Sequence, residues 1–139
     1  MPLIRRATAT DIEDVFELTR RFAMTFRPEF DAFRRAFDHL IAQEDTVLLV
    51  IEEPGGLLGY LLGFDHYALA SNGRIAWIEE IMVRQDRRRE GLGRELMRQF
   101  EQWAATRGSK LVALATRRAR AFYLSLGYEE SAGYFRKLL

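Results

Sequence analysis

"RREGLGRELM", residues 88–97, places Gly91 and Gly93 two positions apart, after a run of arginines and at the start of a helix-like pattern. The first backbone amides of a helix have no partners within it and carry part of its positive dipole, so they bind anions. Glycines at such a point let a phosphate approach the backbone. The side chains that add positive charge are Arg88, Arg89 and Arg94. The stretch predicts a diphosphate site, although glycines and solvated arginines also begin helices that bind nothing.

Apolar residues on both sides of this stretch follow the periods of strands and helices in turn. Thr10 and Glu13 have the spacing of a capping box, so the first helix should begin near Asp11. Strands are predicted over residues 3–8, 46–53, 57–66, 74–83 and 110–116, with two short strands in residues 128–139. Helices are predicted over residues 11–23, 28–41, 92–107 and 117–127. The order β-α-α-β-β-β-α-β-α-β-β describes a single mixed α/β domain over residues 1–139.

Composition limits the classes of protein to which this domain can belong. Its 139 residues are 48% hydrophobic, which is enough to build one core. Lys plus Arg number 21 and Asp plus Glu number 20, so the net charge of +1 favours neither nucleic acid nor an anionic membrane as a partner. The absence of cysteine excludes a thiol nucleophile, and two histidines argue against a dedicated metal site. No apolar run approaches the ~20 residues that span a bilayer, so we expect a soluble, cytoplasmic protein.

Two motifs resemble those of a known superfamily. The residues from Arg88 to Gly93 are similar to the R/Q-x-x-G-x-G/A signature of the GNAT superfamily of acyl-CoA N-acyltransferases, and a strand that ends at Val83 precedes them. "TRRARAFYLSLGY", residues 116–128, is similar to the A-x-x-F-Y-x-x-x-G-F/Y pattern of the same superfamily. The chain departs from many members at Thr116, where they carry Asn. The resemblance implies a mostly antiparallel sheet of six or seven strands flanked by about four helices.

The resemblance also implies acetyl-CoA as the acyl donor, with no metal. Its pyrophosphate would lie on the amides and side chains of Arg88, Arg89, Glu90, Gly91, Leu92, Gly93 and Arg94. Its pantetheine arm would extend the sheet by pairing with Ile81, Met82 and Val83. Phe122 would flank that arm, and Thr116 would either contact the cofactor or cap the following helix. Tyr123 stands where the general acid of the superfamily usually stands, although Phe-Tyr in an amphipathic helix is also ordinary packing.

Transfer of an acyl group to an amine requires a group that accepts the proton of the amine. Glu79 and Glu80 are the candidates, and on a regular strand they would face opposite sides. We prefer Glu79, because bases in the superfamily often lie on the face shared with Ile81 and Val83. An acidic pair can also be a solvated face or a partner for arginine, and a water relay could replace both carboxylates.

Three functions are compatible with the sequence. The first is an N-acetyltransferase that moves an acetyl group from acetyl-CoA directly to a primary amine, with a small-molecule acceptor favoured over a protein. The second is a catalytically silent module that binds an acyl-CoA as a sensor or scaffold. The third, a nucleic-acid-binding protein that uses its mixed basic and aromatic stretches, conflicts with the near-neutral charge. Members of the superfamily often pair, so a homodimer is also compatible with the resemblance.

Overall fold

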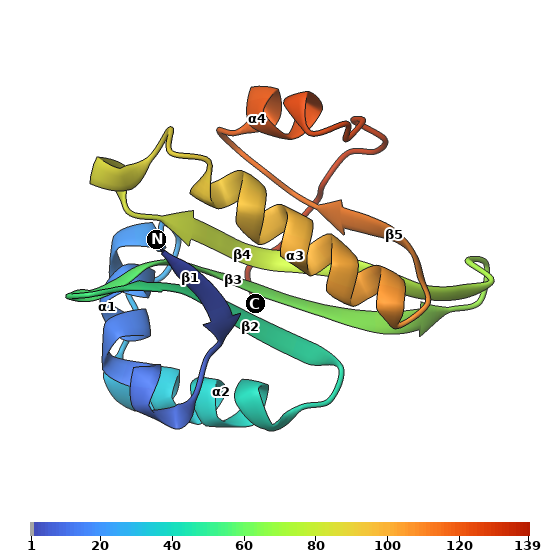
Figure 1. Cartoon of the computed structure of the whole chain (residues 1–139). Helices are drawn as coiled ribbons and strands as arrows, with labels where there is room; N and C mark the ends of the chain where they lie inside the picture. The colour runs from blue at the N-terminus through green and yellow to red at the C-terminus, as the bar shows by residue number, and fades with distance from the viewer. Residues whose placement is uncertain (1) are drawn as a thin grey trace.

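A computed structural model describes residues 2–139, and Figure 1 shows one twisted sheet with helices on both faces. The strands are β1 (Leu3–Arg6), β2 (Thr46–Glu53), β3 (Gly56–Ala68), β4 (Gly73–Val83) and β5 (Ser109–Leu114). They lie in chain order across the sheet. The pairs β1–β2, β2–β3 and β3–β4 are antiparallel, and the pair β4–β5 is parallel. The sheet is therefore mixed and mostly antiparallel, as predicted.

Four helices cover the sheet: α1 (Ile12–Phe22), α2 (Phe30–Ala42), α3 (Leu92–Thr106) and α4 (Arg120–Ser125). Two short 3-10 turns, η1 (Ala9–Asp11) and η2 (Gln85–Arg87), precede α1 and α3. In Figure 1, α3 crosses one face of the sheet, α1 and α2 lie on the other, and α4 lies above the N-terminal half of α3. None of the helices in residues 2–139 is long and apolar enough to cross a membrane.

The two faces of the sheet bury separate cores. The α3-side core includes Leu61 and Ile78 from the sheet and Leu96 and Phe100 from α3. These α3 residues are four apart, so the stripe predicted from the sequence is the buried one. The α1-side core includes Val15, Leu18, Phe37, Tyr60, Leu62 and Met82. A β4 residue can therefore be assigned to a face by the core that it joins.

A β-bulge interrupts β4 at Glu79. Leu62 of β3 pairs with Glu80, while the next residue, Gly63, pairs with Ile78, so Glu79 is an extra residue in β4. Ile78 belongs to the α3-side core. In a regular strand Glu80 would share its face, because side chains two apart point the same way. The bulge instead lets Glu80 reach Tyr60 of the α1-side core.

The structure differs from the sequence-based prediction at both ends of the chain. The two short strands predicted in residues 128–139 are wrong: no strand follows β5 in the described chain, because residues 129–139 are exposed and pair with no strand. At the other end, the Asp11 carboxylate accepts the backbone N–H of Thr8 at 2.7 Å, so a capping interaction forms two residues earlier than the predicted Thr10–Glu13 pair. The Thr8–Asp11 pair is favoured over the Thr10–Glu13 pair because Arg5 also binds the Asp11 carboxylate.

Candidate active site

The start of α3 offers a row of free backbone donors. Gly91 is the N-cap and has a φ of +82°, a left-handed conformation that favours glycine. The first amide to find a helical acceptor is that of Glu95, which donates to the carbonyl of Gly91 at 3.0 Å. Within the described chain, no backbone N–H of residues 88–94 donates to another residue. These amides and the helix dipole therefore remain available for an anion.

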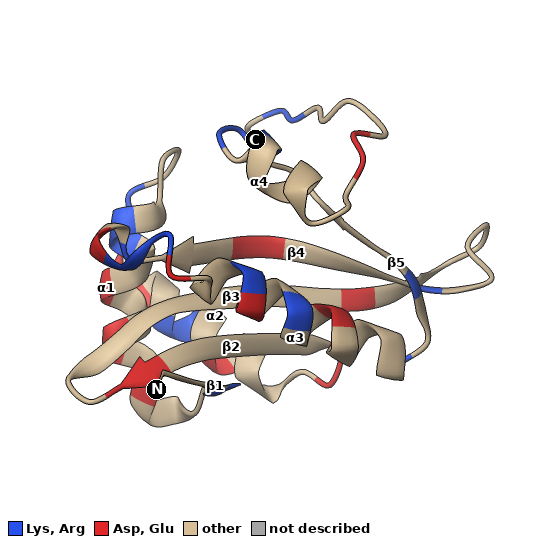
Figure 2. Ribbon diagram, turned by 45° about the horizontal axis from the view of Figure 1, so that its top comes forward, with Lys and Arg blue, Asp and Glu red and all other residues tan. Residues whose placement is uncertain are grey.

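Figure 2 shows the arginine-rich loop that joins β4 to α3, and its arginines differ in what they contact. Arg87 is held by Glu53 and Glu90, so its charge is already neutralised. Arg88 donates through Nε to the carbonyl of Val83 at 3.1 Å, which fixes the loop to the end of β4. Arg89, with a φ of +68°, and Arg94 are both exposed. Arg88, Arg89 and Arg94 form no ion pair within the described chain, so their charges are the ones left for the predicted anion site.

The last five residues of β4 leave one edge of the strand open. β4 pairs with β3 as far as Val83, but its pairing with β5 ends at Ile78. The backbone of residues 79–83 therefore has strand partners on one side only. A Cβ on Gly59 of β3 would lie 2.3 Å from the carbonyl oxygen of Met82, so a glycine is needed for this close approach. The open edge contains Ile81, Met82 and Val83, the residues predicted to pair with an extended ligand.

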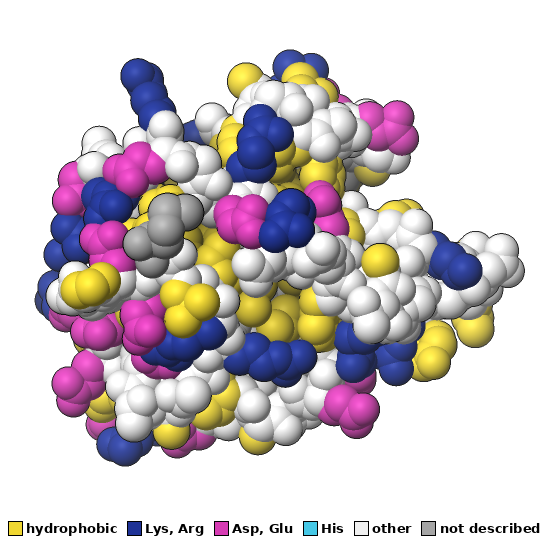
Figure 3. All heavy atoms as spheres, viewed as in Figure 1, with side chains coloured by type: hydrophobic (Ala, Val, Ile, Leu, Met, Phe, Trp, Pro, Cys, Tyr) yellow, Lys and Arg dark blue, Asp and Glu magenta, His cyan; other side chains and the backbone are white. Residues whose placement is uncertain are grey.

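Helix α4 places aromatic side chains beside the start of α3. A Cβ on Gly93 would meet the Phe122 ring at 3.4 Å, so the second glycine lies directly against α4. Tyr123 is 7% exposed and packs between the rings of Phe122 and Tyr128, at centroid distances of 5.0 and 6.0 Å. Burial raises the pKa of Tyr123, which keeps its phenol protonated. Figure 3 shows hydrophobic side chains on the underside of the lobe that contains α4.

Thr116 caps the turn before α4. Its Oγ1 accepts the backbone N–H of Ala119 at 3.1 Å. The N-cap of α4 is Ala119, which has no side-chain cap, so this bond stabilises the turn that precedes the helix. Thr116 is also exposed, so its hydroxyl remains reachable from solvent.

Glu79 and Glu80 lie in different surroundings. Glu79 is exposed and accepts a hydrogen bond from the indole N–H of Trp77 at 3.2 Å. Glu80 is half-buried, and its Oε1 accepts the phenol O–H of Tyr60 at 2.8 Å. Burial raises the pKa of Glu80, the charge of Glu79 raises it further, and the Tyr60 hydrogen bond opposes both. Glu80 lies on the side of Tyr60 and Met82, and the bulge at Glu79 separates it from the face of Ile78.

Two residues behind Glu80, Tyr60 of β3 and Thr19 of α1, were not predicted from the sequence. Tyr60 is 1% exposed, and its oxygen lies 3.2 Å from Oγ1 of Thr19. In the sequence, Tyr60 is one of several apolar residues in a buried strand, and Thr19 is one position on an amphipathic helix. The strand register brings Tyr60 next to Glu80, and the packing of α1 on β3 brings Thr19 to Tyr60.

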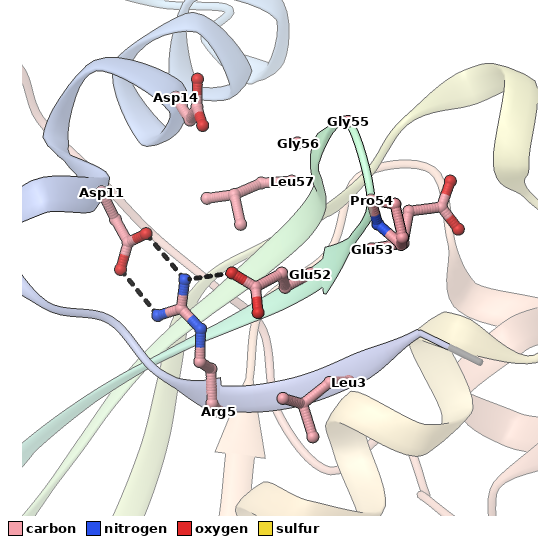
Figure 4. Close-up of a pocket in the computed structure, with 10 residues that line it drawn as sticks. All are labelled: Leu3, Arg5, Asp11, Asp14, Glu52, Glu53, Pro54, Gly55, Gly56 and Leu57. Atoms are coloured by element: carbon pink, nitrogen blue, oxygen red, sulfur yellow. Dashed lines mark hydrogen bonds and ion pairs between the residues drawn. The ribbon is translucent and has the colours of Figure 1, made fainter.

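A hollow at the opposite edge of the sheet, shown in Figure 4, is lined by a network of ion pairs that stabilises the fold. Arg5 of β1 donates to both carboxylate oxygens of Asp11, at 2.8 and 2.9 Å, and to Glu52 at 2.9 Å. Arg5 holds the pKa of Asp11 below its usual range. This network ties β1 to β2 and to the start of α1. Across residues 2–139, no group of three acidic or histidine side chains is arranged to hold a metal ion.

The chain belongs to the acetyltransferase (GNAT) family, whose family model matches residues 12–128. It is also similar to the uncharacterized N-acetyltransferase YhfO of Bacillus subtilis (strain 168), with 27% identity over 140 residues that cover 94% of this chain and 92% of the relative. The family and the relative both support acetyl transfer as the class of activity.

Solved structures share the fold over the whole chain. A transcriptional regulator from Bacillus halodurans C-125 superposes with a TM-score of 0.89 at 23% identity, with all of both chains covered. Aminoglycoside N-acetyltransferase AAC(6')-Iy, solved with a bisubstrate analogue of CoA and acetylneamine, superposes with a TM-score of 0.83 at 18% identity. Coverage is 100% of this chain and 99% of that chain. At these identities the likeness shows a common fold and leaves function to be argued from the site.

Proposed function

We propose that this protein is an acetyl-CoA-dependent N-acetyltransferase that transfers the acetyl group directly to a small-molecule amine. The observation that carries the proposal is the continuity of two binding surfaces. The open edge of β4, residues 79–83, leads through one short loop to the free amides of residues 88–94. A ligand with an extended amide-containing arm and a diphosphate can use both surfaces at once.

In this proposal, each part of the donor is bound by a different group of residues. The amides around Gly91, with Arg88, Arg89 and Arg94, bind the diphosphate through hydrogen bonds and charge. The unpaired backbone of Ile81–Val83 binds the arm as an additional strand would. Bound acetyl-CoA supplies an activated thioester carbon that an uncharged amine can attack.

Glu80 is the base that this arrangement favours, in place of the sequence-based preference for Glu79. Its half-buried carboxylate lies beside the open edge of β4 and has a raised pKa, which makes it a better proton acceptor than an exposed glutamate. Glu80 contacts the α1-side core, whereas Tyr123 belongs to the α3-side core. The pairing of β5 with β4 ends at Ile78, which leaves an opening between the two strands. In this proposal, Glu80 and Tyr123 approach one substrate through that opening.

Tyr123 would donate its proton to the departing thiolate. We expect Tyr123→Phe to keep the affinity for acetyl-CoA, because the ring still packs between Phe122 and Tyr128. Turnover at neutral pH should fall by about 100-fold. Calorimetry measures the affinity, and thiol release measures the turnover. Undiminished turnover in the variant would remove Tyr123 from the mechanism.

A small-molecule acceptor is supported by the structural neighbour AAC(6')-Iy, which was solved with a bisubstrate analogue of CoA and acetylneamine. Direct transfer predicts that acetyl-CoA and amine bind together, without an acetylated enzyme. The cytoplasmic location and the homodimer suggested by the sequence stay predictions.

The proposal is tested by thiol release from acetyl-CoA across a panel of amino sugars, polyamines, amino acids and peptide amines. We expect amine-dependent release with at least one class, and an acetylated product that mass spectrometry identifies. Stoichiometric binding of acetyl-CoA without transfer to any class would favour the silent binding module instead.

A further inference from the structure

A short chain of hydrogen bonds supports Glu80 from the side opposite the opening in β4. The phenol of Tyr60 donates to Oε1 of Glu80 at 2.8 Å. The hydroxyl of Thr19 lies 3.2 Å from the phenol oxygen and 2.8 Å from the carbonyl oxygen of Val15, so its single proton has two acceptors within reach. The three side chains come from α1, β3 and β4.

We infer that Tyr60 and Thr19 are positioning residues that orient the Glu80 carboxylate for the amine substrate. This inference rests on the proposed function, in which Glu80 accepts the proton of the amine. Tyr60 binds one oxygen of the carboxylate, and Oε2 of Glu80 accepts no hydrogen bond from any residue in 2–139. The oxygen that is free to take a proton is therefore held in one direction by the bond to its neighbour.

The chain of hydrogen bonds orients Glu80 and does not conduct protons away from it. Tyr60 is 1% exposed, and the chain continues inward to the carbonyl of Val15, which has no proton to pass on. Burial, and to a smaller extent the charge of Glu80, raise the pKa of Tyr60, so the phenol stays protonated throughout the range of an enzyme assay. A proton taken up by Glu80 leaves by the side that faces the substrate.

The phenol also favours the charged form of Glu80, because an O–H donor binds a carboxylate more strongly than a carboxylic acid. The titratable groups that act on Glu80 are Tyr60 from β3 and Glu79 from its own strand, and they act in opposite directions. α1, which also contacts β4, contributes the uncharged hydroxyl of Thr19 through Tyr60. Each neighbour therefore predicts a shift of known sign in the proton affinity of Glu80.

The test is the pH dependence of kcat/KM for Tyr60→Phe, measured by thiol release with an amine that the wild-type protein accepts. The variant keeps the ring and its edge contact with Phe22, whose centroid lies 6.4 Å away. We expect the acidic limb of the profile to move up by about one to two pH units, because a carboxylate without its donor holds a proton more tightly. Acetyl-CoA affinity should not change.

Two further variants should move the acidic limb of the same pH profile by other amounts. Thr19→Val removes a hydroxyl while nearly keeping the side-chain volume, and it should move the acidic limb in the same direction by less. Glu79→Gln removes a repelling charge and should move the limb to lower pH. A Tyr60→Phe profile that superposes on the wild type, or a loss of rate that is equal at every pH, would overturn the inference.

A readout without turnover separates this inference from the proposed function. The carboxyl carbon of Glu80, assigned in a ¹³C spectrum by its absence from Glu80→Gln, reports its pKa directly. That pKa should be higher in Tyr60→Phe than in the wild type, and an unchanged value would overturn the inference whatever the activity. An acidic limb that persists in Glu80→Gln would instead contradict the role of Glu80 in the proposed function.

Discussion

Two carboxylates lie away from bulk water, Asp65 of β3 and Glu80 of β4, and they differ in the charge of their partners. The side chain of Asp65 is fully buried and is bound by Arg74 at 2.9 Å and by Arg107 at 2.5 and 3.1 Å. Glu80 is half-buried, has no cationic partner in the described chain, and receives one neutral donor from Tyr60. Its charged neighbour, Glu79, has the same sign.

This difference separates a structural carboxylate from a reactive one. Two guanidinium groups compensate Asp65 and tie β3 to β4 and to the end of α3, where β4 still pairs with β5. Glu80 lies beyond the bulge, where that pairing has ended. A carboxylate with little compensation holds its proton more tightly than an ordinary glutamate, which makes it a better proton acceptor. The bulge at Glu79 marks the boundary between the two regions.

The largest effect should come from Glu80→Gln, which keeps the shape and the acceptor for Tyr60 but removes the base. We expect turnover with a reactive amine to fall by about 100- to 10,000-fold, while acetyl-CoA affinity stays the same. Thiol release and calorimetry measure the two quantities. Glu79→Gln is the matched control and should keep most of the activity at neutral pH. If the two variants have exchanged phenotypes, Glu79 is the base.

Asp65→Asn should have the next largest effect, on stability. It leaves Arg74 and Arg107 without their buried partner, so the free energy of unfolding should fall by about 3 kcal/mol. Asp45→Asn removes a more exposed partner of the same two arginines and should cost less than about 1 kcal/mol. Urea unfolding measures the free energy of unfolding of both variants. Equal losses would mean that the burial of Asp65 does not make it more important for stability than Asp45.

The smallest effect is a pH-dependent stabilisation by Glu80→Gln. The folded state raises the pKa of Glu80 above its ordinary value of 4.5, so the folded protein binds a proton more tightly than the unfolded chain. Wild-type stability therefore decreases as pH rises through this interval, and the decrease is complete above the folded pKa. The variant should be slightly more stable than the wild type at pH 7, and the gain should shrink towards pH 4. A gain in stability that is independent of pH would mean that the variant is stabilised by packing and not by the loss of a titrating group.

The sequence predicted the features of this site that depend on local backbone chemistry. Gly91 and Gly93 identified the start of α3, and the left-handed N-cap at Gly91 favours a residue without a Cβ. The 3.6-residue period identified the buried face of α3. Arg87, which the site prediction did not include, is engaged by Glu53 from a distant strand, a contact that the sequence does not indicate.

The features that depend on strand pairing were not predicted. The sequence around Glu79 has no glycine or proline that would indicate a bulge, so the bulge and its separation of Glu80 from the face of Ile78 were not predicted. The role of Tyr60 follows from the same register. Residues 128–139 contain strand-forming residues, but a strand also needs an edge that receives it, and the folded chain does not bring one to them.

The central claim, that an acyl-CoA binds at the junction of β4 and α3, is tested most directly by calorimetric titration with acetyl-CoA. The comparison is between the wild type, Gly91→Glu and Gly108→Glu. Gly91 and Gly108 lie at opposite ends of α3, with φ of +82° and +87° and open space around both, so the two variants share their strain and their added charge. We predict stoichiometric binding by the wild type and Gly108→Glu, and loss of binding by Gly91→Glu. A folded wild-type protein that does not bind, or two variants that lose binding equally, would contradict the account.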